Sequence, residues 1–259
     1  MNKRIEVNGE TLNCVIEGTG PAIAFVHFLG GFSYQWRHQF AALRERYTCI
    51  AFDHRGFGYS SFNGRWDVPT GAADLKAGLD ALGIERAHIV GYSMGGPIAL
   101  VFNAQWPQKV RSLILIDTFA KYGGQGQARI DESEKCLRYM SMREYARQYC
   151  ATRFLPSTPQ AAVDELVSAI CLAKKDAYLD VLRGILLPDF TAHCANVTAP
   201  TLVMCGSHDR TTPVELSNDL TRLIAGAVER IIPTGHLGVF DDPAAFNRPL
   251  VEFLDAQPR

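Results

Sequence analysis

The sequence lacks an excess of charge of either sign, which excludes one broad class of partner. Its 259 residues include 26 Lys and Arg against 27 Asp and Glu, a formal net charge of −1. Proteins that bind nucleic acid normally carry a basic excess, so we expect no nucleic-acid partner. Hydrophobic residues make up 47% and charged residues 20% of the chain, a composition typical of globular and not of disordered proteins.

Long apolar runs are also missing. No stretch approaches the ~20 apolar residues that span a bilayer, so we expect no membrane association. The opening residues, MNKRIEVNGETLNC, contain no apolar segment of the secretory-signal type, so we expect a cytoplasmic protein. Nothing in the sequence indicates the oligomeric state.

Metal-binding patterns are absent as well. The seven cysteines are scattered, and no CxxC pair or Cys/His cluster with metal-ligand spacing occurs. We therefore expect no metal site and no cofactor, and free thiols in a reducing compartment.

What is present is an alternation of strand and helix patterns. Strands are expected at 22–27, 47–53, 87–92, 110–117, 201–206 and 228–232, and helices at 33–45, 69–82, 94–105, 213–225 and 243–255. The 22–27 segment, AIAFVH, is apolar up to its last residue, as buried parallel strands are. Near the start, Asn8-Gly9 between two short strand patterns predicts a hairpin. The sequence therefore predicts an α/β fold with a mostly parallel sheet and helices on both faces.

The alternation stops between residues 119 and 190, where only helical patterns occur, at 132–150, 160–173 and 175–187. We interpret 1–118 and 191–259 as an α/β core and 119–190 as a helical cap. Sites in open α/β sheets lie at the carboxyl ends of the strands, so a cap there would cover the site.

The segment from Gly91 to Gly96, GYSMGG, follows an expected strand and precedes an expected helix. A GxSxG motif in this setting is typical of a nucleophile elbow, a turn so tight that the positions two before and two after the serine must be small. Ser93 is therefore the candidate nucleophile.

A serine nucleophile needs a base and an acid that orients the base. Of seven histidines, His236 lies in a loop after the last expected strand, from which it can reach Ser93. Asp209 follows the 201–206 strand. The order Ser, Asp, His along the chain is the one that accompanies a nucleophile elbow of the GxSxG type. Asp117, at the end of the preceding strand, is a second candidate acid.

An oxyanion hole needs two backbone N–H groups. The residue after the nucleophile, Met94, should supply one. The other should come from the loop after the 22–27 strand, where Leu29 precedes Gly30-Gly31.

These segments together resemble the α/β-hydrolase family. The resemblance rests on VHFLGG, FDHRGFGYS, VGYSMGG, TLVMCGSHDRTTP and IPTGHLGVFDDPAAF, in the family's order. It implies an eight-stranded sheet and a Ser93–His236–Asp209 triad beneath a helical cap inserted after the sixth strand. It disfavours haloalkane dehalogenases and epoxide hydrolases, which use aspartate where Ser93 stands. Phe28 occupies a position where members usually have glycine.

Within the family the chain is most similar to the 3-oxoadipate enol-lactonase branch, including the run DTFAKYGGQGQARI. That likeness implies a serine hydrolase of aromatic catabolism that cleaves a small ester or lactone, such as a carboxylate-bearing enol-lactone. We expect Phe28 and Tyr122 to contact the substrate, and Arg129 or Arg138 to bind its carboxylate.

Other functions fit the same motifs. A carbon–carbon bond hydrolase or an acyl-homoserine lactonase would use the same triad, because the cap contacts decide specificity. Cofactor-free peroxidases or dioxygenases and non-enzymatic ligand sensors also occur on this fold. An intact nucleophile and base argue against a sensor.

Overall fold

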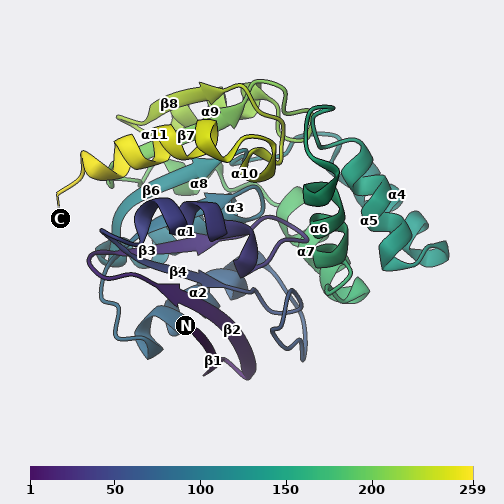
Figure 1. Ribbon diagram of the computed structural model, residues 1–259, viewed down its shortest axis with the longest axis horizontal. Coiled ribbons are helices and arrows are strands. Elements are labelled where there is room, and N and C mark those ends of the chain that lie inside the picture. Colours follow the sequence, from purple (N-terminus) through teal and green to yellow (C-terminus); the bar gives the residue numbers. More distant parts are fainter. Residues whose placement is uncertain (259) are drawn as a thin grey trace.

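The computed structural model describes residues 1–258 and contains an eight-stranded sheet flanked by helices (Figure 1). The strands are β1 Asn2–Val7, β2 Glu10–Glu17, β3 Ala22–Val26, β4 Thr48–Phe52, β5 Ala87–Tyr92, β6 Val110–Ile116, β7 Thr201–Gly206 and β8 Val228–Ile232. Their order in the sheet is β1-β2-β4-β3-β5-β6-β7-β8. Only the β1–β2 and β2–β4 pairs are antiparallel, so the expected α/β fold with a mostly parallel sheet is confirmed.

Helices connect the parallel strands. They are η1 Ser33–Trp36, α1 Arg37–Leu43, α2 Val68–Ala81, α3 Gly95–Gln105, η2 Pro107–Lys109, α4 Gly126–Tyr139, α5 Met142–Ala151, α6 Gln160–Ile170, α7 Lys175–Leu186, α8 Thr191–Cys194, α9 Val214–Leu223, α10 Gly238–Asp241 and α11 Pro243–Asp255, where η marks a 3₁₀ helix. Helices α4 to α7 group at one end of the molecule, opposite the C-terminus (Figure 1). We call residues 119–190 the insertion.

The central strands are buried on both faces because helices cover both. Ile23 and Phe25 of β3 belong to one hydrophobic cluster, whereas Ala24 and Val26 belong to the other. This alternation follows from the pleat, which points successive side chains to opposite faces. It explains why the segment has no polar face in the sequence.

Two of the expected helices have different boundaries in the structure. The 132–150 pattern is two helices, because Ser141 caps a new one: its hydroxyl accepts from the Glu144 N–H, and the Glu144 carboxylate accepts from the Ser141 N–H. This capping box ends α4 and starts α5. The 33–45 pattern begins as a 3₁₀ turn and becomes α-helical at Arg37.

Across residues 1–258, no helix is both long and apolar enough to span a bilayer.

Candidate active site

Ser93 occupies a sharp turn between β5 and α3. Its φ is +51°, in the left-handed region that residues other than glycine rarely adopt. A Cβ on Gly91 would lie 2.4 Å from the Gly95 carbonyl oxygen, and one on Gly95 would lie 2.4 Å from the Val26 carbonyl oxygen. The turn therefore requires glycine at both positions, two residues before and after the serine. Backbone strain of this kind is typical of functional sites.

Ser93, His236 and Asp209 are connected by hydrogen bonds. His236 Nε2 lies 3.1 Å from Ser93 Oγ, and His236 Nδ1 lies 2.7 Å from Asp209 Oδ2. All three residues are buried, with the serine 7% exposed. Because the carboxylate accepts from Nδ1–H, Nε2 is left as the acceptor that faces the serine hydroxyl. The three residues therefore have the relative geometry that proton transfer from a serine hydroxyl requires.

Donors surround the Asp209 carboxylate. Oδ1 accepts from the N–H groups of Thr211 (2.6 Å) and Thr212 (3.0 Å), and Oδ2 accepts from the Thr212 hydroxyl (2.7 Å). Burial raises the pKa of Asp209, but the His236 imidazole and these hydrogen bonds outweigh burial and leave the pKa below its ordinary value. Asp209 is consequently held as an anion beside the imidazole.

Two hydrogen bonds to its backbone hold the loop that carries His236. The buried Tyr92 hydroxyl donates a 2.5 Å hydrogen bond to the His236 carbonyl oxygen, and the Asp241 carboxylate accepts from the Gly235 N–H. Tyr92 directly precedes Ser93, so one strand end positions both the nucleophile and the base.

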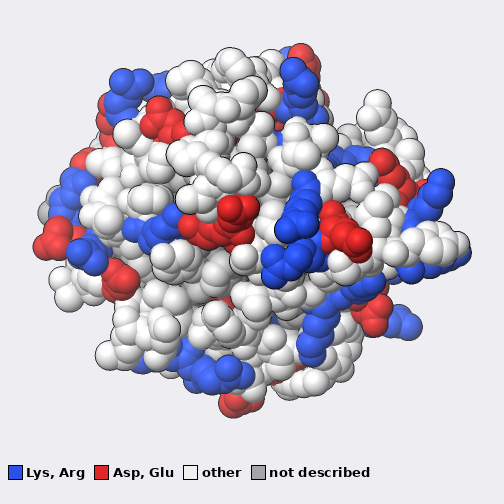
Figure 2. Space-filling view, turned by 45° about the vertical axis from the view of Figure 1, so that its right-hand side comes forward, with Lys and Arg blue, Asp and Glu red and all other residues white. Residues whose placement is uncertain are grey.

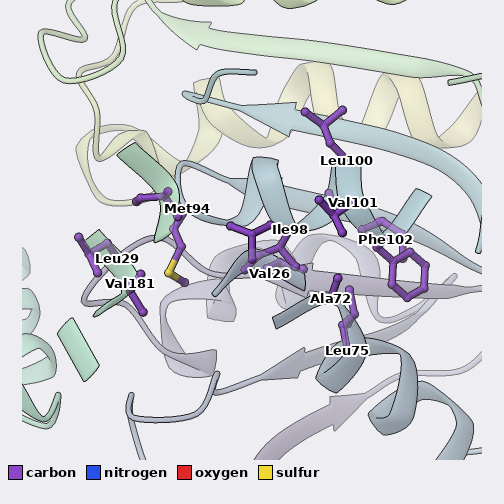
Figure 3. Packing of buried hydrophobic residues seen from close by; sticks show 14 of the residues in the cluster. Val26, Leu29, Ala72, Leu75, Met94, Ile98, Leu100, Val101, Phe102 and Val181 are labelled. Carbon is purple, nitrogen blue, oxygen red and sulfur yellow. The ribbon is translucent and has the colours of Figure 1, made fainter. Parts of the chain in front are cut away.

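The backbone N–H groups of Leu29 and Met94 have no protein acceptor within residues 1–258. The Leu29 loop is fixed by His27, whose Nδ1 donates to the Phe28 carbonyl (2.8 Å) and whose Nε2 accepts from the His54 N–H (3.0 Å). Burial lowers the pKa of His27, which favours this neutral form. Leu29 and Met94 lie together with Val181 of α7 at one end of the core (Figure 3). Two free donors beside Ser93 could stabilise an oxyanion.

A cavity of about 290 Å³ separates the sheet from the insertion. Ser93, His236 and Leu29 line it on the core side. Tyr122 and Arg129, both expected to bind substrate, line it on the insertion side. The Tyr122 hydroxyl donates to the Thr211 carbonyl (3.2 Å) and accepts from Arg129 Nη1.

Arg138 and Phe28 were both expected to contact the substrate, but neither lines the cavity. Arg138 is exposed and does not line the cavity. The cavity face of α4 is formed by Arg129, Glu132, Ser133 and Cys136. At about 100° per residue, the nine residues from Arg129 to Arg138 place Arg138 about half a turn away from that face.

Phe28 is also misassigned. Its side chain is fully buried and does not line the cavity. Its ring packs edge-on against Tyr92 and Phe240. The residue that replaces glycine in the oxyanion loop therefore points into the core, away from the cavity.

Two polar residues of the site were not predicted from the sequence. Arg153 of the turn after α5 lines the cavity, and Thr212 hydrogen-bonds Asp209. The Tyr149-x-x-x-Arg153 spacing could have indicated a stacked pair, because residues four apart share a helix face. Thr212, three residues after Asp209, fits a local side-chain turn.

Asp117 lies behind Asp209 instead of contacting His236. Its Oδ1 accepts from the Gly206 N–H (2.7 Å). Asp117, Cys205 and Asp209 bring potential metal-ligand atoms within 4.8 Å of one another. Both Asp209 oxygens already accept hydrogen bonds, so this cluster is better suited to holding the acid than a cation.

Comparison with known proteins places this geometry in context. A family model described as the alpha/beta hydrolase fold matches residues 21–143. A pyrrolizixenacetamide deacetylase from Xenorhabdus hominickii is 28% identical over 98% of both chains. The structure of a hydrolase from Pseudomonas aeruginosa superposes with a TM-score of 0.90 at 26% identity, covering 98% of both chains. The enol-lactonase from Burkholderia xenovorans has a TM-score of 0.91 at 24% identity, covering 98% of this chain and all of that one, a likeness of fold.

Proposed function

Because the chain belongs to the alpha/beta-hydrolase family and is a hydrolase, we propose that it cleaves a small ester or lactone through an acyl-enzyme on Ser93. The observation that carries the proposal is the hydrogen-bonded series from Ser93 through His236 to Asp209, which opens on a cavity. In this role the insertion acts as a cap that excludes water from the reacting groups.

The geometry supports a two-stage reaction. His236 Nε2 takes the Ser93 proton as Oγ attacks the carbonyl carbon, and the Asp209 carboxylate stabilises the imidazolium. The Leu29 and Met94 N–H groups stabilise the oxyanion. The bond to the leaving alkoxide then breaks, and His236 protonates that oxygen. A water, deprotonated by His236, attacks the acyl-enzyme. The acyl–Oγ bond breaks, His236 returns the proton to Ser93 Oγ, and the acid is released.

For the substrate we favour a carboxylate-bearing enol-lactone such as 3-oxoadipate enol-lactone. Support comes from the likeness to the enol-lactonase branch and from arginines in the cavity wall. A second candidate is removal of an acetyl group, suggested by the name of the deacetylase relative. We further propose a cytoplasmic location, which suits seven free cysteine thiols.

The direct test is hydrolysis of 3-oxoadipate enol-lactone and of a small acetate ester by wild type, Ser93→Ala and Ser168→Ala. Ser168 is exposed on α6 and serves as the control serine. We expect Ser93→Ala to lose ~10⁴-fold or more in kcat on any substrate that wild type turns over. Wild type and Ser168→Ala should also be labelled covalently by a fluorophosphonate, whereas Ser93→Ala should not. Retention of most activity by Ser93→Ala would overturn the proposal.

A further inference from the structure

Arg129 and Arg153 face the cavity without a carboxylate partner among residues 1–258. Other arginines that are at least partly buried do have acidic partners in two cases, the pairs of Arg37 with Glu165 and Arg55 with Asp74. Neither cavity arginine makes an ion pair, and each is only partly exposed. A partly buried cation that the protein leaves unpaired is available to a ligand anion.

Tyrosines hold both guanidinium groups in place. Arg129 Cζ lies 5.1 Å from the centre of the Tyr122 ring, and Arg129 Nη1 donates to the Tyr122 hydroxyl. Arg153 Cζ lies 3.8 Å from the centre of the Tyr149 ring. Stacking on an aromatic face neutralises no charge but restricts the side chain, so less conformational entropy is lost when a ligand binds.

Two nitrogens of the Arg153 guanidinium have no hydrogen-bond partner among residues 1–258. Nη1 donates to the Tyr149 carbonyl and to the Thr152 hydroxyl, both at 3.0 Å. Nε is buried without a partner. Nη2 has no partner in the described chain either. The Nε–Nη2 edge is one of the two edges of arginine that can bind both oxygens of a carboxylate.

The two arginines act on one region of the cavity. Arg129, Arg153 and Tyr149 line the same cavity. Burial raises the pKa of Tyr149 to about 12, and the positive charges of Arg153 and Arg129 both oppose that rise. Among residues 1–258, Glu132 is the one acidic residue that lines the cavity. Two cations and one anion leave a net charge of +1, which matches a ligand with a single carboxylate.

The face of the molecule that includes the insertion offers no comparable selection. Figure 2 shows basic and acidic side chains interspersed over the face that includes the insertion. Such a mixed surface gives little long-range steering of anions. We therefore assign discrimination by charge to the cavity.

On the basis of the acyl-transfer function proposed above, we propose that Arg129 and Arg153 form an anion subsite that selects esters or lactones carrying one carboxylate. Arg153 binds the carboxylate through its guanidinium, and Arg129 supplies a second positive charge. Ser93 lines the same cavity, so an anchored carboxylate would position the scissile carbonyl of a small substrate at the nucleophile.

The test compares two substrates that share one scissile bond, glutarate monomethyl ester and glutarate dimethyl ester. Their rates are followed by pH-stat titration for wild type, Arg129→Gln, Arg153→Gln and Arg138→Gln. Arg138 is the matched control, because it lies on α4 but is exposed outside the cavity. The neutral diester reports whether each variant remains folded and active.

We expect wild type to prefer the monoester by ~100-fold in kcat/KM. This factor corresponds to twice the free energy of a tenfold change in affinity. Each cavity variant should lose ~10-fold or more of this preference, mainly through a higher KM, as expected for a lost charge-assisted hydrogen bond. Diester hydrolysis should fall less than monoester hydrolysis does, because the diester has no carboxylate for either arginine to bind. Arg138→Gln should behave as wild type does.

Glutarate itself provides a readout that needs no turnover. We expect Ser93→Ala to bind glutarate in isothermal titration calorimetry, and Ser93→Ala/Arg153→Gln to bind it at least ~10-fold more weakly. A wild type without charge preference, or a preference that both cavity variants leave unchanged, would overturn the subsite. If Ser93→Ala hydrolysed both esters as fast as wild type does, the result would instead overturn the function on which the subsite rests.

Discussion

The carboxyl groups of Asp117 and Asp209 lie within 4.8 Å of each other, in a buried cluster with the Cys205 thiol. Asp209 has His236 and several donors around it, whereas Asp117 Oδ2 is buried without a partner. Two adjacent buried carboxyl groups do not both ionise readily. Burial, reinforced by the charge of Asp209, holds the pKa of Asp117 well above its ordinary range. We interpret Asp117 as the neutral member of the pair.

Asp117 should therefore make folding pH-dependent. The unfolded chain releases this proton near pH ~3.9, whereas the folded chain retains it, so the free energy of unfolding falls as the pH rises above that value. The fall is about 1.4 kcal/mol per pH unit, and it ends once the pH exceeds the raised pKa. Asp117→Asn, which cannot ionise, should lose this slope and become more stable relative to wild type as the pH rises.

Urea denaturation of wild type and Asp117→Asn at a series of pH values measures this difference. Asp164→Asn, an exposed change on α6, is the control, and its stability should follow that of wild type. Parallel stability curves for wild type and Asp117→Asn would show that Asp117 is ionised in the folded protein.

The Thr212 hydroxyl should contribute to catalysis through Asp209. It donates to Asp209 Oδ2, the oxygen that also accepts from His236 Nδ1. Hydrogen bonds to charged groups contribute about 1.5–3 kcal/mol. We expect Thr212→Val to lower kcat by ~10-fold or more with little change in KM, because the oriented acid matters most when the imidazolium forms.

Thr212→Ser is the matched control, since it keeps the hydroxyl and should retain most of the activity. Asp209→Asn should cost far more, ~10³-fold or greater, because it removes the charge that stabilises the imidazolium. Steady-state kinetics on any ester that wild type hydrolyses ranks the three variants. Equal rates for Thr212→Val and Thr212→Ser would show that the hydroxyl has no role.

Strand ends were readable in the sequence because they combine buried apolar runs with a local motif. The run AHIVGY followed by SMGG predicts both β5 and its turn, and parallel strands bring their carboxyl ends to one edge. Ser93, Asp209 and His236 could therefore be linked in one hypothesis although they are distant in the chain.

The insertion was less predictable because tertiary packing decides which face of each helix meets the cavity. Arg129 and Arg138 look equivalent in the sequence, but the phase of α4 turns only Arg129 inward. Arg153 lies just beyond the end of α5, and its position depends on stacking with Tyr149. The orientation of Phe28 depends on the backbone path of a loop, which no periodicity encodes.

Gly95 of the nucleophile turn should not tolerate a side chain. A Cβ at position 95 would lie 2.4 Å from the Val26 carbonyl oxygen, a backbone atom of β3 that cannot move without distorting the sheet. We expect Gly95→Ala to destabilise the fold by about 2 kcal/mol or more, the range for overpacking in a core.

Gly64→Ala is the matched control, since a Cβ there would meet nothing within 4 Å and the backbone has no positive φ. Gly64→Ala should be neutral or slightly stabilising, because alanine restricts the unfolded chain. Urea denaturation measures the stability of both variants. Their activity shows separately whether a variant that folds still holds Ser93 in its catalytic position. If Gly95→Ala folds with nearly wild-type stability and activity, the turn is more plastic than its contacts indicate, and the positive φ of Ser93 is not enforced by its surroundings.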